Sequence, residues 1–304
     1  MQKILIVGSG DIARRILFRL HGPCRAGRYR IYALLREPET AAFWRRAGAI
    51  PLVGDLDDRA SLRRLAGLAD QVLHLAPPPG TGQQDSRTRH LLSALSAGGS
   101  LPRRLVYVST TGIYGDCAGA WIDETRRCRP ESVRAIRRVD AERRLREWGR
   151  KGGRRGVCVS ILRAPGIYAA DRLPLERLRQ GLPVLTADED VYSNHIHADD
   201  LAAACLAALR HGRANRVYNA VDDSDLRMAD YFDCVADASA LPRPPRLSRN
   251  AAAARLSPLQ WSFMRESRRI MNRRLKRELK LRLAYPTVAV GIAKAAAGRN
   301  SCSS

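Results

Sequence analysis

The sequence predicts an α/β protein with a doubly wound parallel sheet and a smaller, discontinuous C-terminal lobe. A short apolar run at the N-terminus passes through a glycine turn into a segment whose apolar residues have helical spacing. Further short apolar runs alternate with helix-length segments, which is typical of strand–helix–strand units in a parallel sheet. With 304 residues and a hydrophobic content of 45%, the chain can bury one large core or two unequal ones.

The first strand and the turn after it carry an informative motif. The apolar run Ile4–Val7 leads into Gly8-Ser9-Gly10-Asp11-Ile12-Ala13, and apolar residues recur at Ile16, Leu17 and Leu20. This order of strand, G-x-G-x-x-A turn and helix predicts a dinucleotide site, because small residues let a diphosphate approach the backbone and the helix N-terminus offers free N–H groups. A glycine turn in another kind of α/β sheet is the alternative interpretation.

The residue after the second predicted strand bears on the choice of cofactor. Arg36 follows the strand Arg30–Leu35, and an arginine there favours the 2′-phosphate of NADP. An acidic residue, such as the neighbouring Glu37, would favour the free 2′-hydroxyl of NAD. We therefore expect NADP as the preferred cofactor, with NAD as the alternative.

The next two predicted strands end in residues suited to the same ligand. Asp55 and Leu56 follow the strand Ala49–Val53, and Asp55 is placed to contact the adenine amino group. Leu75-Ala76-Pro77 ends the strand Gln71–Leu75. Both segments are expected at the carboxyl edge of the sheet, where open α/β sheets bind ligands.

Four later segments, in this order, carry a more specific signal. They are Leu105–Asp116, Leu162–Tyr168, His195–Ala202 and Val217–Asp223. Together they resemble the extended and atypical short-chain dehydrogenase/reductase superfamily, and above all its NAD-dependent epimerase/dehydratase group. The resemblance implies a Rossmann NAD(P)-binding domain at 1–168 with a crossing strand and helix at about 192–212. The substrate lobe would then comprise 169–191 and 213–304.

The resemblance also implies roles for particular residues. Thr110 is similar to the family's serine or threonine that hydrogen-bonds the substrate oxygen, with Thr111 as the second choice. Pro165-Gly166-Ile167 is similar to the loop that holds the nicotinamide amide. Asp199 or Asp200 is expected to cap the helix Leu201–Arg210.

The family's Tyr-x-x-x-Lys pair is absent from this chain. Counting back from Ala141-Glu142 in the helix Glu131–Trp148, Arg134 stands at the tyrosine position and Arg138 at the lysine position, four residues apart on one face. Arg138 can keep the lysine's contact with the ribose. Arg134 cannot transfer a proton near neutral pH, but it can stabilise an oxyanion or bind a carboxylate or phosphate of the substrate. The alternative is an exposed basic helix face.

Another group would then have to supply the proton. The candidates in the family's layout are Tyr114, Tyr168, Glu131, His195 and His197. The sequence does not choose among them, because acid–base catalysis requires a contact of about 3 Å that only a structure reveals.

The net charge of +23 comes almost entirely from arginine. The sequence shows no motif typical of a nucleic-acid-binding fold, so we expect a solvated basic surface rather than a nucleic-acid partner. The basic segment Ser262–Leu281 is predicted to be an amphipathic helix. The seven scattered cysteines predict neither a disulfide framework nor a metal site and favour the cytoplasm. No membrane span is expected.

These observations predict an NAD(P)-dependent oxidoreductase or epimerase-like enzyme. It would transfer a hydride to or from a carbonyl or a sugar-nucleotide-like small molecule, and an anionic substrate would suit the arginines. The missing tyrosine supports one alternative from a different class, a non-catalytic NADP-binding redox sensor or regulatory protein. A monomer and a homodimer are both left open.

Overall fold

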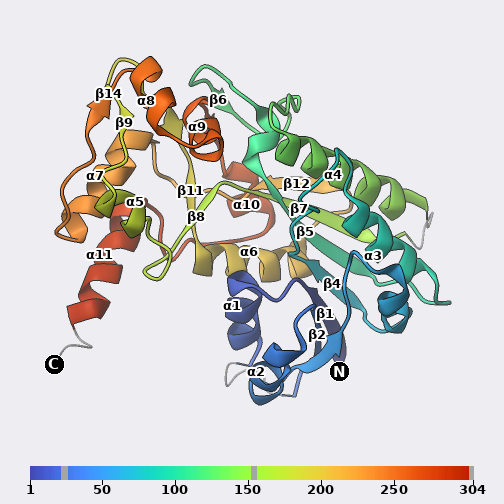
Figure 1. Cartoon of the computed structure of the whole chain (residues 1–304). Helices are drawn as coiled ribbons and strands as arrows, with labels where there is room; N and C mark the ends of the chain where they lie inside the picture. Colours follow the sequence, from blue (N-terminus) through green and yellow to red (C-terminus); the bar gives the residue numbers. More distant parts are fainter. Residues whose placement is uncertain (22–26, 152–155, 301–304) are drawn as a thin grey trace.

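The computed structural model describes residues 1–21, 27–151 and 156–300. Its centre is a seven-stranded, all-parallel sheet with the strand order β12-β7-β5-β4-β1-β2-β3 (Figure 1). These strands are β1 (Gln2–Val7), β2 (Tyr29–Leu35), β3 (Ile50–Val53), β4 (Gln71–His74), β5 (Arg104–Thr110), β7 (Cys158–Ala164) and β12 (Arg216–Asn219). The chain runs outward from β1 to β3 and then returns to the other side at β4, so the predicted doubly wound fold is confirmed.

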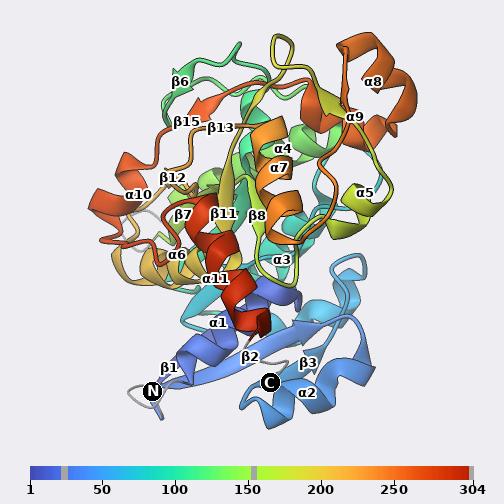
Figure 2. The ribbon, with the colours of Figure 1, turned by 90° about the vertical axis from the view of Figure 1, so that its left-hand side faces the viewer.

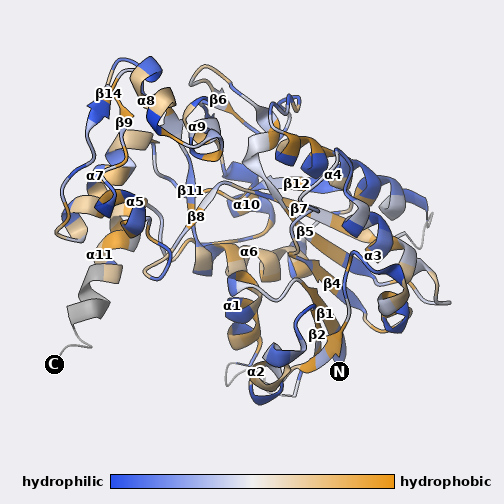
Figure 3. Cartoon of the chain, viewed as in Figure 1, coloured by the Kyte–Doolittle hydropathy of each residue, from blue (hydrophilic) through white to orange (hydrophobic). Residues whose placement is uncertain are grey.

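Helices cover both faces of this sheet. One face packs against α1 (Asp11–Leu20), α2 (Ala41–Arg46) and α6 (Ala198–His211), and the other against α3 (Ser86–Ser96), α4 (Val133–Lys151) and the 3-10 helix η3 (Arg59–Leu65). In β1, Ile4 and Ile6 point to the first face while Leu5 and Val7 point to the second. This burial on both sides explains the continuous apolar run in the sequence, which Figure 3 shows as hydrophobic strands beneath more polar helices.

Short elements connect these layers. The 3-10 helices η2 (Pro38–Thr40) and η4 (Thr111–Tyr114) follow β2 and β5. The strand β6 (Trp121–Ile122) pairs with β15 (Arg269–Ile270), and α10 (Arg273–Glu278) follows β15. None of the described helices combines the length and the apolar character that crossing a bilayer requires.

A second lobe has its own apolar core, which includes Leu178, Val184, Phe232, Val235 and Met264. Its helices are α5 (Leu175–Arg179), α7 (Met228–Ala238), α8 (Arg249–Arg255), α9 (Pro258–Met264) and α11 (Val288–Asn300). Its strand pairs are β9 (Val184–Leu185) with β14 (Arg246–Leu247) and β10 (Tyr192–Ser193) with β13 (Leu226–Arg227). The parallel pair β8 (Gly166–Tyr168) and β11 (His195–His197) runs between the sheet and this lobe (Figure 2).

The basic segment Ser262–Leu281 is not the single amphipathic helix that the sequence predicted. It contains the end of α9, the strand β15 and the helix α10. The side chain of Asn194 accepts from the N–H of Ile270 and donates to the carbonyl of Arg268, and β6 pairs with β15. These contacts hold the middle of the segment extended, because its backbone N–H and C=O groups form hydrogen bonds with partners distant in the sequence.

The predicted cap of the crossing helix was also wrong. The side chain of His197, one residue before α6, accepts the N–H of Asp199 and caps the helix. Asp199 pairs with Arg15, and the buried carboxylate of Asp200 accepts the N–H groups of Ala284 and Tyr285, each at 2.9 Å. Both acids have tertiary partners, which sequence spacing alone does not reveal.

Candidate functional site

A cavity of about 200 Å³ lies at the carboxyl ends of β1 to β4. Seven residues that the sequence analysis assigned to a cofactor line it: Gly8, Ser9, Arg36, Asp55, Leu56, Ala76 and Pro77. It lies where the strand order reverses, between β1 and β4, which is where open α/β sheets bind nucleotides.

The glycine turn fits the diphosphate of a dinucleotide. Gly8 has a φ of +100°, and a Cβ there would lie 2.6 Å from the backbone nitrogen of Ala76, so only glycine allows this close approach of β1 to β4. A Cβ on Gly10 would meet nothing within 4 Å, and no side chain caps α1. Open space therefore adjoins a helix N-terminus, which attracts anions.

Sequence reasoning missed Arg87 as a member of this cavity. It is the second residue of α3, donates to both carboxylate oxygens of Asp57 at 2.9 and 2.6 Å, and holds the pKa of Asp57 below its usual range. Arg36, by contrast, is mostly exposed, and among the described residues its one ion pair is with Glu37. The start of α3 is far from the glycine turn in the sequence. Only the folded chain brings Arg87 to this cavity.

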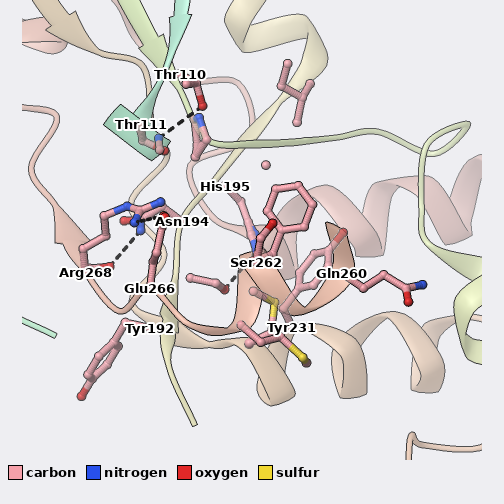
Figure 4. Close-up of a pocket in the computed structure, with 18 of the residues that line it drawn as sticks. Thr110, Thr111, Tyr192, Asn194, His195, Tyr231, Gln260, Ser262, Glu266 and Arg268 are labelled. Atoms are coloured by element: carbon pink, nitrogen blue, oxygen red, sulfur yellow. Dashed lines mark hydrogen bonds and ion pairs between the residues drawn. The ribbon is translucent and has the colours of Figure 1, made fainter. Parts of the chain in front are cut away.

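A second, larger cavity of about 470 Å³ lies between the sheet and the second lobe (Figure 4). Thr110 and Thr111, Arg134 of α4, and the segment Pro165-Gly166-Ile167 line it from the first domain. Residues of β10, β11, α5, α7 and α9 line it from the other side. The predicted substrate-orienting threonine, the predicted nicotinamide loop and the arginine expected at the tyrosine position thus share one cavity.

The side chains of Thr110 and Arg134 are held by local contacts. The Oγ1 atom of Thr110 accepts the N–H of Gly112 at 3.3 Å, so its hydroxyl proton remains available for another acceptor. The guanidinium carbon Cζ of Arg134 lies over the ring of Phe263 of α9, 4.7 Å from the ring centre. A guanidinium in contact with an aromatic ring keeps N–H groups that can donate to an anion.

Arg138 makes different contacts from Arg134, although both are on α4. Its Nη1 atom donates to the Tyr107 hydroxyl and the Val108 carbonyl, each at 2.8 Å, and Arg138 lines neither cavity. Gly10, Ile12 and Leu75 also line neither cavity, and Asp11 faces a groove on the outer side of α1. The expected contacts of these residues with a cofactor stay predictions.

Four of the five candidate proton donors are occupied elsewhere. Tyr114 is buried and bonds Asn219 and Arg163, and Tyr168 is buried and donates to the Thr287 carbonyl. His197 caps α6, and exposed Glu131 accepts the N–H of Asp116. His195 alone of the five lines the larger cavity.

Within the described residues, no group of three or more histidines, cysteines or acids is arranged to hold a metal ion.

Comparison with known proteins adds to this geometry. A sequence model of the NAD-dependent epimerase/dehydratase family matches residues 4–220. GDP-6-deoxy-D-mannose reductase of Pseudomonas aeruginosa is 28% identical over 193 residues, which cover 56% of this chain and 63% of that protein. The match therefore spans less than two thirds of that reductase.

Solved structures share the fold over nearly the whole chain. A functionally unknown conserved protein from Silicibacter pomeroyi is 28% identical, with a TM-score of 0.80 over 98% of this chain and 99% of that one. A short-chain dehydrogenase/reductase superfamily protein from Agrobacterium tumefaciens with bound NAD has a TM-score of 0.75 at 19% identity, over 99% and 98% of the two chains. A human epimerase family protein with NADPH has a TM-score of 0.76 at 17% identity, over 97% and 99%. Since the family model matches well over half of the chain, the protein belongs to the NAD-dependent epimerase/dehydratase family, as the resemblance predicted.

Proposed function

We propose that this protein is an NAD(P)-dependent oxidoreductase or epimerase acting at a carbonyl or carbinol carbon of a small molecule. One observation carries the proposal: Thr110, Arg134 and the segment Pro165–Ile167 line a single cavity of about 470 Å³. That cavity and the smaller one both adjoin the carboxyl ends of the parallel strands, as a ligand with an adenosine end and a reactive end would require.

The chain offers residues for each part of such a cofactor. The diphosphate would be held by Gly8, Ser9, Gly10, Asp11 and Ile12, the adenosine by Arg36, Asp55 and Leu56, the ribose by Arg138, and the nicotinamide amide by Pro165, Gly166 and Ile167, with Leu75, Ala76 and Pro77 beside them. When bound, the nicotinamide supplies or accepts a hydride.

The protein's own side chains would then orient the substrate. The Thr110 hydroxyl donates to the substrate oxygen and fixes its position. Arg134 offers a fixed positive charge to that oxygen or to an anionic group beside it. The second lobe forms the opposite wall of the cavity and shields it from part of the solvent, which strengthens both interactions.

The cofactor preference can be tested at Arg36. Arg36→Ala would remove a charge-assisted hydrogen bond to the 2′-phosphate. This variant should therefore bind NADPH about tenfold or more weakly, while its affinity for NADH should change little. Calorimetric titration measures both affinities. Arg45→Ala, at an exposed arginine of α2 that does not line the cavity, is the matched control. Equal losses for the two cofactors would contradict a preference for NADP.

Turnover separates the enzyme from its alternative. The name of the Pseudomonas relative makes sugar nucleotides the first substrates to test, followed by small carbonyls and alcohols, with oxidation of NADPH or reduction of NADP⁺ followed by absorbance. With a true substrate, Thr110→Ala should lower kcat about 100-fold, because a donor to the reacting oxygen is lost.

The arginine at the tyrosine position favours a second candidate, a non-catalytic NADP-binding redox sensor or regulator. Tight cofactor binding with no turnover across the panel would support it over the enzyme. A cytoplasmic location and a monomer or homodimer remain proposals from the sequence.

A further inference from the structure

The strands around the nicotinamide loop bring one imidazole to the cavity wall. Thr110 pairs with Ala164 in the β5–β7 register, and His195 pairs with Gly166 in the β8–β11 register. The backbones of Thr110 and His195 therefore each lie beside the same short stretch of chain, residues 164–166. Both side chains line the cavity, as Figure 4 shows.

The imidazole of His195 is held in place by its neighbours. The His195 Nε2 atom lies 3.2 Å from Ser193 Oγ, and Ser193 also lines the cavity. The ring of Tyr231 on α7 packs against it at 4.0 Å between centroids and an angle of 68°, and Tyr168 of β8 lies farther away at 6.3 Å. An imidazole fixed in this way is pre-oriented for a proton transfer.

The other titratable groups of the cavity are less suited to accept a proton. Glu266 is paired with Arg268 at 2.6 Å, and Tyr192 lies against the guanidinium of Arg269. Burial raises the pKa of Tyr231 well above its usual value, so Tyr231 keeps its proton. The cavity arginines keep theirs at any physiological pH.

We propose that His195 is the acid–base residue of this site and that the substrate is an anionic alcohol. Its carboxylate or phosphate, next to the carbinol carbon, would be bound by Arg134. This inference rests on the proposed function and adds the substrate class and the group that handles the proton.

The reaction balances in atoms and charge. In the oxidation direction the carbinol O–H bond breaks and its proton moves to the imidazole of His195. The carbinol C–H bond also breaks, its electron pair and hydrogen reduce the oxidised nicotinamide, and the carbon becomes a carbonyl. Thr110 donates a hydrogen bond to the oxygen throughout, while Arg134 holds the neighbouring anion.

The electrostatics of the cavity link the proton acceptor to the charge of the substrate. Burial lowers the pKa of His195 to about 3, so in the free protein the imidazole is neutral and only a weak base, and an anion bound nearby is needed to raise that pKa. An anion on Arg134 would stabilise the imidazolium that forms. A neutral alcohol would bring no such charge, and the buried imidazolium would then cost more to form.

Anion binding tests the substrate class without turnover. Oxalate and inorganic phosphate, as carboxylate and phosphate probes, are titrated calorimetrically into the NADPH-loaded protein. We expect one of them to bind, and Arg134→Gln to weaken that binding at least tenfold. Arg143→Gln, an exposed arginine on the same helix paired with Asp140 and Glu147, is the control and should leave it unchanged. Binding of neither probe, or equal loss in both variants, would overturn the proposal.

Turnover of matched alcohols tests the proton acceptor. Malate, lactate and glycerol 3-phosphate are compared with neutral diols of similar size as reductants of NADP⁺. We expect oxidation of the anionic alcohols only. Whichever of them is oxidised fastest shows whether the site prefers a carboxylate or a phosphate. His195→Gln should lower kcat about 100-fold or more with little change in KM or NADPH affinity, and it should abolish the fall of kcat at acid pH that we expect of the wild type.

The outcomes separate this inference from the proposed function. If neither NADPH nor NADH binds, the proposed function fails. If NADPH binds and neutral substrates turn over equally well, or if Tyr231→Phe loses kcat while His195→Gln retains it, only the present inference fails. Should His195→Gln not fold, His195→Asn and the wild-type pH profile of kcat give the same readout, and a profile flat down to acid pH would count against His195.

Discussion

Two glycines of the turn after β1 have different physical roles. Gly8 is needed for the backbone, because its φ is +100° and a Cβ would lie 2.6 Å from the Ala76 nitrogen. Gly10 has no such constraint, since a Cβ there meets nothing within 4 Å. The sequence motif gives both residues the same apparent importance, and the structure separates them.

This difference predicts opposite phenotypes for two alanine variants. Gly10→Ala should keep the wild-type unfolding free energy, since the added methyl group meets nothing within 4 Å. If the proposed diphosphate site is right, that methyl group would enter it and weaken NADPH binding at least tenfold. Gly8→Ala should lose on the order of 2 kcal/mol or more of stability as well, through strain and steric overlap. Urea unfolding and calorimetric titration measure the two effects. Unchanged cofactor affinity in Gly10→Ala would argue against the diphosphate site.

Asp222 provides a pH-dependent test of burial. Its carboxyl group is buried, and its Oδ2 atom has no hydrogen-bond partner among the described residues. Burial raises the pKa of Asp222 to about 7. The folded protein therefore holds a proton between about pH 4 and 7 that the unfolded chain has released, so this group makes the protein less stable as pH rises through that range.

The expected size follows from the linkage relation. Relative to Asp222→Asn, the wild type should lose about 1.4 kcal/mol of unfolding free energy per pH unit between about pH 4 and 7, and the difference should level off above pH 7. Denaturant unfolding of both proteins at several pH values measures it. A constant difference across this range would show that the carboxyl group is ionised in the folded state.

At the scale of elements, a buried ion pair fixes α4 against β7. The Nε and Nη2 atoms of Arg163 donate to the two carboxylate oxygens of Glu142 at 3.1 and 2.7 Å, and both side chains are almost completely buried. Arg163 also donates to Tyr114 after β5. This pair orients the helix that carries Arg134 and Arg138.

Breaking the pair on one side should be costly. Glu142→Leu leaves an uncompensated buried guanidinium and should destabilise the protein by about 3–5 kcal/mol, whereas the double variant Glu142→Leu with Arg163→Met should recover a large part of that loss. The exposed pair of Arg143 and Glu147 serves as the control, and Arg143→Gln should change stability by less than about 0.5 kcal/mol. Strict additivity of the two core substitutions would refute this account.

Sequence patterns identified the helices and strands whose formation depends on residues close together in the chain. The alternation of apolar runs with helical segments predicted the first four strands of the sheet and the helices α4 and α6 close to their observed bounds. The segment Ser262–Leu281 was mistaken for a helix because its periodicity is helical, while Asn194 and β6 hold its middle extended. The same lack of local information hid the capping role of His197.

At the scale of the whole molecule, the net charge of +23 should oppose compactness. Many of the arginines form ion pairs, yet 53 basic residues face only 30 acidic ones. Raising the salt concentration from about 10 to 150 mM shortens the screening length from about 30 to 8 Å and should therefore reduce long-range repulsion.

We expect the unfolding temperature to rise by a few degrees over that range of sodium chloride. Calorimetry or thermal shift at constant pH measures the change, and an uncharged osmolyte such as sucrose at equal osmolality is the control. A fall in unfolding temperature with added salt would mean that local ion pairs outweigh the net repulsion.

The fold class, the family and the glycine turn follow from sequence motifs, since each motif consists of residues that are neighbours in the chain. The composition of the site depends on how the chain folds. The spacing of Arg134 and Arg138 predicts that both lie on one helix face. In the folded protein, the guanidinium of Arg134 contacts the Phe263 ring, whereas that of Arg138 donates to the carbonyl of Val108. Likewise, only the folded structure shows that His195 lines the larger cavity, whereas His197, two residues later on the same strand, caps α6. Contacts between residues far apart in the chain leave no local pattern, so the fold alone reveals them.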